Sequence, residues 1–109
     1  MTDAAAADRR PLDELFAVLG DPTRRAVLEQ LVHDGPQTAT ELAAHFPSTR
    51  QAVVKHLRVL ADAGLVTPER SGREVHYRAT TARLADAVTW LIGASDGWDR
   101  RIDRLRSRG

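Results

Sequence analysis

The sequence contains no cysteine, and its aromatic content is only 5%. The absence of cysteine excludes disulfides, thiolate metal sites and thiol redox sensing. The scarcity of aromatics disfavours an RNA-binding platform, which stacks bases on such rings. No apolar run is long enough to span a bilayer, and residues 1–7 lack a signal-peptide pattern. We therefore expect a soluble, cytoplasmic chain with no membrane partner.

The chain has 109 residues, of which 42% are hydrophobic. This suits one domain with one packed core and leaves little room for a second core around a substrate pocket. There is no glycine-rich phosphate loop, and the four serines lack an evident His–acid constellation. We expect a binding module and not an enzyme.

Charge is distributed unevenly although the formal net charge is only +1. Residues 1–21 carry two basic and five acidic side chains, whereas residues 50–78 carry six basic and three acidic ones. A concentration of positive charge on one segment is what a polyanion site needs. Solvated charged faces are also common, so the charge alone leaves both readings open.

Residues 1–10 are rich in alanine and have nothing to bury, so we expect a flexible N-terminal tail followed by a single domain over residues 11–109. Leu12, Leu15, Phe16 and Leu19 share one face of a first helix. Asp21 and Pro22 then predict the start of a second helix, which ends near residues 34–36.

A helix-turn-helix is predicted over residues 38–64. Thr38 or Thr40 caps a short third helix that ends at Phe46, before Pro47. Ser48 or Thr49 caps the fourth helix, and Gly64 stops it. Residues 65–79 read as one two-stranded hairpin with a Ser-Gly tip. The predicted fold is thus mainly α with a two-stranded β-wing, a winged helix-turn-helix of about five helices.

A final helix is predicted over residues 81–106. Its apolar stripe advances in steps of four and three residues, which is the period of a helix-packing seam. Gly93 and Gly97 weaken the helix, so a break near residues 93–97 is the alternative. The stripe would stay exposed on so small a domain unless it packed on a second copy or on the chain's own first helix.

The fourth helix divides into an apolar face and a polar face that carries Gln51, Lys55 and Arg58. A glutamine amide pairs with adenine, and arginine binds guanine or phosphate. Val54 on this face could touch a thymine methyl. A small basic hairpin with Arg70, Arg73 and Arg78 suits a minor groove or a phosphate backbone. The alternatives without a DNA-binding function are an amphipathic helix with a basic outer face and an ordinary surface hairpin.

Three stretches in this order resemble the ArsR/SmtB family of winged-helix repressors: VLGDPTRRAVLEQL at 18–31, TATELAAHFPSTRQAVVKHLRVLADAGLV at 38–66 and RSGREVHYRAT at 70–80. The resemblance covers roughly residues 12–80. Trp90 and the stretch WDRRIDRL at 98–105 resemble a metal-independent branch of that family.

The resemblance implies a repressor or autorepressor that binds an inverted-repeat operator in double-stranded DNA as a homodimer, joined through its first and last helices. Two departures affect the site. Val54 stands where the family usually has a small polar residue, and Ser48 stands where an apolar one is commoner. The predicted DNA-binding residues are Ser48, Thr49, Arg50, Gln51, Val54, Lys55, His56, Arg58, Arg70, Arg73 and Arg78. The predicted dimer interface is Leu12, Leu15, Phe16, Leu84, Val88, Leu91, Trp98, Ile102 and Leu105.

No metal and no cofactor is expected. The third helix has no thiol, residues 81–106 contain no histidine, and the four histidines lie on different elements without ligand spacing. Two further functions remain as alternatives: a winged-helix module that binds proteins, and a regulator whose small-molecule effector occupies a dimer-interface pocket lined by Trp90 and Trp98. The sequence does not identify an effector.

Overall fold

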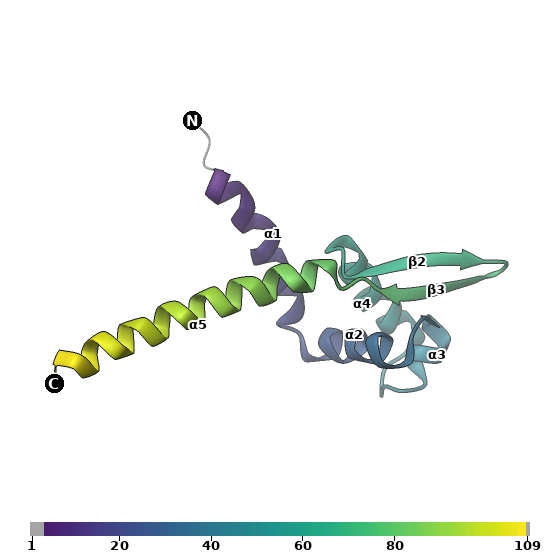
Figure 1. Cartoon of the computed structure of the whole chain (residues 1–109). Coiled ribbons are helices and arrows are strands. Elements are labelled where there is room, and N and C mark those ends of the chain that lie inside the picture. The colour runs from purple at the N-terminus through teal and green to yellow at the C-terminus, as the bar shows by residue number, and fades with distance from the viewer. Residues whose placement is uncertain (1–3, 109) are drawn as a thin grey trace.

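The computed structural model describes the backbone of residues 4–108 and the side chains of residues 12–97 and 99–107. A bundle of helices carries a protruding β-hairpin at one end, and a long helix projects from the other (Figure 1). The elements within the described range are α1 (Ala4–Leu19), α2 (Pro22–Asp34), β1 (Gln37–Thr38), α3 (Ala39–Ala43), α4 (Arg50–Asp62), β2 (Val66–Ser71), β3 (Glu74–Ala79) and α5 (Ala82–Arg108). The predicted winged helix-turn-helix is confirmed.

Helix α1 begins earlier than the sequence predicts. The tail expected over residues 1–10 is helical from Ala4 onward, and residues 1–3 lie outside the described range. Alanine has the highest intrinsic helix propensity, so Ala4 to Ala7 favour extending the helix. Asp21 then caps α2 by accepting hydrogen bonds from the backbone N–H groups of Thr23 (2.8 Å) and Arg24 (3.2 Å).

The helix-turn-helix forms through two threonine caps. Thr38 and Glu41 make a reciprocal capping box at the start of α3, which settles the choice between Thr38 and Thr40. Helix α3 ends at Ala43, and the chain reaches Phe46 through turns, so the expected continuation of the helix to Phe46 is wrong. Thr49 caps α4 by accepting from the backbone N–H of Ala52 at 3.1 Å.

The core lies where α1, α2, α3 and α4 meet the base of the hairpin. Each of these helices contributes apolar side chains to it, and the fully buried large side chains are Leu15, Val27, Leu31, Leu42, Val53, Leu57, Leu60 and Leu65. Burial of such a side chain stabilises the fold by roughly 1.5–3 kcal/mol. The packed face of α4 therefore fixes which of its faces points to solvent.

The wing belongs to a three-stranded antiparallel sheet in the order β1-β3-β2. The expected two-stranded hairpin is present, with Val66 opposite Ala79 and Ser71 opposite Glu74. The third strand was not predicted: Gln37 and Thr38, just before α3, pair with Tyr77 and His76. Two residues cannot display an alternating pattern, so the sequence carries no signal for this strand.

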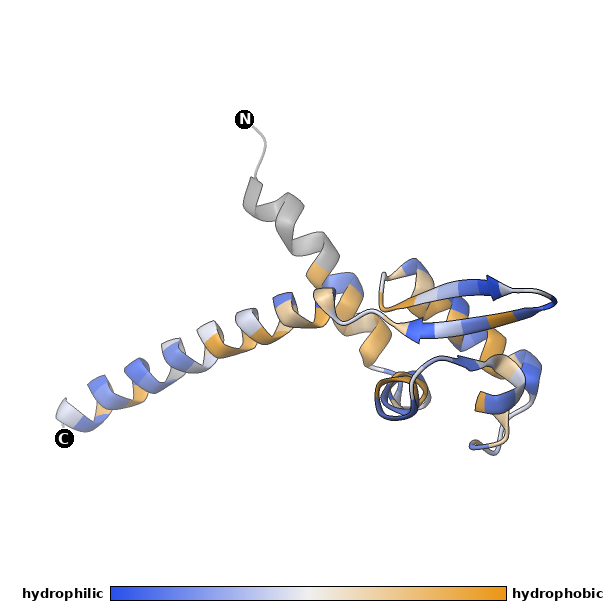
Figure 2. Cartoon of the chain, turned by 45° about the vertical axis from the view of Figure 1, so that its right-hand side comes forward, coloured by the Kyte–Doolittle hydropathy of each residue, from blue (hydrophilic) through white to orange (hydrophobic). Residues whose placement is uncertain are grey.

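Helix α5 is continuous from Ala82 to Arg108, so the alternative break near residues 93–97 does not occur. Gly93 and Gly97 each cost about 1 kcal/mol relative to alanine, which leaves the helix intact. Apolar segments lie on the part of α5 near the body of the molecule, and polar segments dominate toward its C-terminal end (Figure 2). No helix in the described part of the chain is both long enough and apolar enough to cross a membrane.

Candidate nucleic-acid interface

Helix α4 turns its polar face to solvent beside the wing. Its buried face consists of Val53, Leu57 and Leu60. Four predicted DNA-binding residues lie exposed on the rest of its surface: Arg50, Gln51, Lys55 and Arg58. The structure thus brings two arginines, one lysine and one glutamine onto one exposed surface of the same helix.

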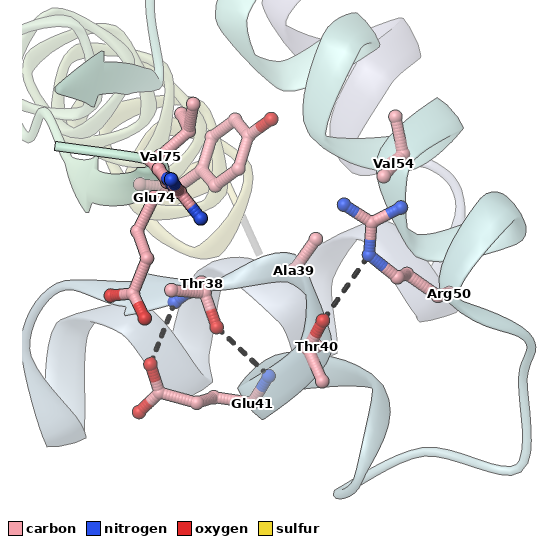
Figure 3. Close-up of a pocket in the computed structure, with 10 residues that line it drawn as sticks. Thr38, Ala39, Thr40, Glu41, Arg50, Val54, Glu74 and Val75 are labelled. Carbon is pink, nitrogen blue, oxygen red and sulfur yellow. Dashed lines mark hydrogen bonds between the residues drawn. The ribbon is translucent and has the colours of Figure 1, made fainter. Parts of the chain in front are cut away.

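The first turn of α4 is held by two neighbouring side chains. Thr49 occupies the N-cap, and Ser48 precedes it in the turn, so Thr49 is the residue that caps the helix. The Nε of Arg50 donates to Oγ1 of Thr40 in α3 at 3.2 Å (Figure 3). This bond restricts the Arg50 side chain, which carries about 2 kcal/mol of rotamer entropy when free.

A cavity of about 650 Å³ separates α3 and α4 from the wing. Its lining contains one arginine from α4, one arginine from the wing turn, two carboxylates, and several threonine and apolar side chains. The lining residues are Thr38, Ala39, Thr40, Glu41, Arg50, Val54, Arg73, Glu74, Val75 and Tyr77. Figure 3 shows Arg50 and Val54 on one side and Glu74 and Val75 on the other. The cavity is open, and it continues the exposed surface of α4 toward the wing.

One carboxylate of this cavity has a perturbed pKa. The backbone N–H of Thr38 donates to Glu41 and lowers the pKa of its carboxyl, and the Thr38 hydroxyl and the charge of His76 act in the same direction. Glu41 is therefore ionised at neutral pH and engaged in the capping box.

Val54 is half-buried at the edge of the core and lines the cavity, so it reaches the cavity only through part of its side chain. His56 is half-buried and follows Gln51 by five residues, which places it about 140° away from Gln51 around α4. The structure therefore separates His56 from the exposed face on which the resemblance placed it.

The three wing arginines do not all lie on the same surface. Arg73 lies in the turn and lines the cavity, and Arg70 pairs across the hairpin with Val75, which also faces the cavity. Arg78 is one residue beyond Tyr77, so it points to the opposite face of the sheet. There its Nε donates to Oε1 of Glu69 at 2.8 Å. The geometry brings Arg70 and Arg73, but not Arg78, onto the side of α4.

The predicted dimer-interface residues divide into buried and exposed groups. Leu15 is completely buried in the core of a single chain and is not available to a partner. Leu12, Phe16 and Leu84 are half-buried against the same core, and Ile102 is half-buried on α5. The exposed group is Val88 (52% exposed), Leu91 (51%) and Leu105 (64%). The side chain of Trp98 lies outside the described residues.

The sequence reasoning missed Ile92, which is 57% exposed. Its spacing of four residues from Val88 was the available signal, because residues i and i+4 share a helix face. Trp90 packs edge-on against Phe16 of α1 with 5.5 Å between ring centroids, and half of its surface remains exposed. Val88, Leu91 and Ile92 form a continuous apolar surface that we call the α5 stripe.

Comparison with known proteins identifies the family. A family described as "Helix-turn-helix domain" matches residues 19–69. The transcriptional repressor SdpR of Bacillus subtilis is 31% identical over 81 residues, which cover 74% of this chain and 89% of the repressor. The HTH-type transcriptional regulator Rv2034 of Mycobacterium tuberculosis is 41% identical and covers 86% of this chain and 91% of the regulator.

A solved structure, the ArsR-like transcriptional regulator from Rhodococcus sp. RHA1, superposes with a TM-score of 0.81 at 36% identity, covering 94% of this chain and 96% of that one. The chain belongs to the ArsR/SmtB family. As a member of this family it is a DNA-binding transcriptional regulator, and the α3-turn-α4 unit with the adjacent wing is its helix-turn-helix. Among the described residues, no group of three or more metal-ligating side chains is placed to hold a metal ion.

Proposed function

We propose that this ArsR/SmtB-family regulator binds an inverted-repeat operator as a homodimer and represses transcription from it. Each subunit would place α4 in a major groove, with half-sites about 34 Å apart or a multiple of that distance. The observation that carries this proposal is the exposed face of α4 with Arg50, Gln51, Lys55 and Arg58, held by the Thr49 cap and bordered by the wing.

The shape of the single chain supports the dimer. Its radius of gyration is 18.1 Å, whereas a compact domain of this length has about 13 Å. The excess comes from α5, which is about 40 Å long and extends from the body of the molecule (Figure 1). The α5 stripe is exposed on this projecting helix, and a second copy would bury it.

We also assign different tasks to the binding residues. Gln51 lies in the first turn of α4 on the exposed face, where its amide can make a bidentate contact with adenine. Arg73 lies at the tip of the wing, where its guanidinium can reach a phosphate. Arg50 is turned toward the cavity by its bond to Thr40, so we assign it to phosphate. Thr49 acts as a cap, and His56 and Arg78 are proposed to lie outside the DNA contact surface.

We further propose that the protein acts in the cytoplasm, has no catalytic activity and belongs to the metal-independent branch of the family. The support for the last point is the sequence, which has no cysteine anywhere and no histidine in residues 81–106. The contact of Trp90 with Phe16 favours a packing role for this ring over a ligand cage.

Comparing Gln51→Ala with Arg73→Ala tests the assignment. The operator is first selected from a random duplex pool, and the affinity of each variant is then measured for operator and random duplexes over a range of salt concentrations. Gln51→Ala should remove the preference for the correct base at one position of the operator, which weakens operator binding by about 1–3 kcal/mol. Its affinity for random duplexes should stay unchanged. Arg73→Ala should weaken binding to both duplexes alike and reduce the salt slope by about one.

Arg106→Ala in the exposed C-terminal part of α5 is a matched control, because it removes one positive charge as Arg73→Ala does, on the helix that projects away from the wing (Figure 1). Equal losses for Gln51→Ala and Arg73→Ala on both duplexes would contradict the division of tasks. A wild-type protein that remains monomeric and binds no duplex in dilute buffer would contradict the proposed function itself.

A further inference from the structure

A second groove lies away from the wing, between α1 and the C-terminal end of α4. Its volume is about 430 Å³, and its lining is Glu14, Ala17, Val18, Val59, Asp62 and Ala63. Two carboxylates therefore accompany a mainly apolar lining, and Val59 is 36% exposed there. Neither Glu14 nor Asp62 has an ion-pair partner among the described side chains. The groove suits a segment that is both apolar and basic.

The C-terminal part of α5 has this composition. Ile102 and Leu105 are its apolar side chains, and its four arginines, Arg100, Arg101, Arg104 and Arg106, outnumber its two acidic side chains, Asp99 and Asp103. Leu105 is 64% exposed. Because α5 is one straight element that leads away from the body of the molecule, this part cannot fold back onto the groove of its own chain (Figure 1). A second copy is the available source.

The start of α5 lies next to the groove. The Nη1 of Arg83 donates to the backbone carbonyl of Ala63, which lines the groove, at 2.9 Å. On the same side of the helix, Trp90 contacts Phe16 of α1. Arg101 follows Trp90 by eleven residues, which is close to three full turns, so it lies on the same flank of α5.

Two α5 helices that pack antiparallel about their midpoint at residue 95 bring residues 101–105 of one copy beside residues 85–89 of the other. The twofold axis of such a pair is perpendicular to both helices, so the same flank of each helix faces the same side of the pair. Arg101 of the partner subunit therefore points toward the body of the first chain. The end of one helix thereby reaches the α1–α4 groove of the other copy.

We propose that the α1–α4 groove binds residues 101–105 of the partner subunit. Leu105 of the partner subunit covers the apolar lining, and Arg101 and Arg104 of the partner subunit pair with Glu14 and Asp62. This inference rests on the proposed homodimer and deepens it. By symmetry the dimer then has two such groove contacts besides the α5 stripe, which we call the satellite contacts. Each links the partner's α5 to the C-terminal end of the recognition helix α4.

Charge reversal on each side tests the contact in the full-length protein. One variant carries Glu14→Arg and Asp62→Arg, and the other carries Arg101→Glu and Arg104→Glu. Each variant alone places like charges in both satellite contacts, so its dimer dissociation constant should rise at least tenfold in low salt. A 1:1 mixture has complementary charges in both contacts of the heterodimer, and it should recover near wild-type affinity. Sedimentation equilibrium gives the constants, and native mass spectrometry identifies the heterodimer.

The recovery in the mixture shows that both variants fold. Wild-type dimerisation by both variants, or weakened dimers that the mixture fails to restore, would overturn the groove contact and leave the homodimer standing. A monomeric wild type would instead overturn the proposed function, on which the inference rests.

Discussion

Replacing Thr49 with alanine separates a structural role in α4 from direct contact with DNA. The Oγ1 of Thr49 accepts a hydrogen bond from the backbone N–H of Ala52 at 3.1 Å in an exposed position. The residue three positions after this cap is Ala52, which cannot complete a capping box as Glu41 does for Thr38. Thr49 is therefore the only side chain of the described residues that caps this end.

The expected cost follows from this single bond. Loss of an N-cap residue to alanine costs about 1 kcal/mol, and here the freed N–H remains accessible to water. The midpoint of thermal unfolding should fall by about 4–8 °C for a domain of this size. Arg50 and Gln51 lie in the turn that loses its cap. Re-forming that turn on DNA costs up to about 1 kcal/mol of binding free energy, so the dissociation constant should rise by up to about fivefold.

Thermal unfolding and fluorescence anisotropy with operator DNA measure the two effects on the same samples. Thr49→Ser keeps the acceptor and should resemble the wild type, and Ser48→Ala should leave the unfolding midpoint unchanged because Ser48 does not cap the helix. A hundredfold loss of DNA affinity in Thr49→Ala with unchanged stability would refute the reasoning and make Thr49 a direct DNA contact.

Two further predictions concern pH and backbone conformation. The backbone N–H of Arg24 lowers the pKa of Asp21 below its ordinary value of 3.8, so the cap stabilises the protein above that pH and is lost as the pH falls through the lowered pKa. The difference in unfolding midpoint between wild type and Asp21→Ala should therefore shrink from pH 6 to pH 3, and a constant difference would contradict this. Gly64 has φ +76°, and a Cβ there would lie 3.0 Å from Cδ of Arg83. Gly64→Ala should cost at least about 1–2 kcal/mol in chemical denaturation, and an unchanged free energy of unfolding would contradict this.

Much of the fold could be predicted because periodic burial determines it. Leu57 and Leu60 recur at helical spacing on α4, and both are completely buried. The cap at Thr38 was predictable because Glu41 follows at the required distance. Strand β1 and the early start of α1 were not, since the first is too short to show a period and the second depends on alanine propensity without burial.

The site was predicted less completely because spacing along a helix or strand does not reveal what lies opposite. His56 is adjacent in sequence to Lys55, yet it is half-buried whereas Lys55 is exposed. Leu15 belongs to the same predicted face as Leu12 and Phe16, but the core encloses it completely. Arg78 was grouped with the other wing arginines by charge, and its partner Glu69 becomes evident only from the strand register.

The pairing of β1 with β3 has a consequence for how this family can diversify. The segment immediately before α3 is hydrogen-bonded to the returning strand of the hairpin, at Tyr77 and His76. A hairpin transplanted from a relative must therefore pair correctly with the two residues of β1, which lie some forty positions upstream. Recombination that respects this linkage should exchange residues 37–79 as a block, whereas a graft of the hairpin alone would leave Gln37 and Thr38 facing an unmatched edge.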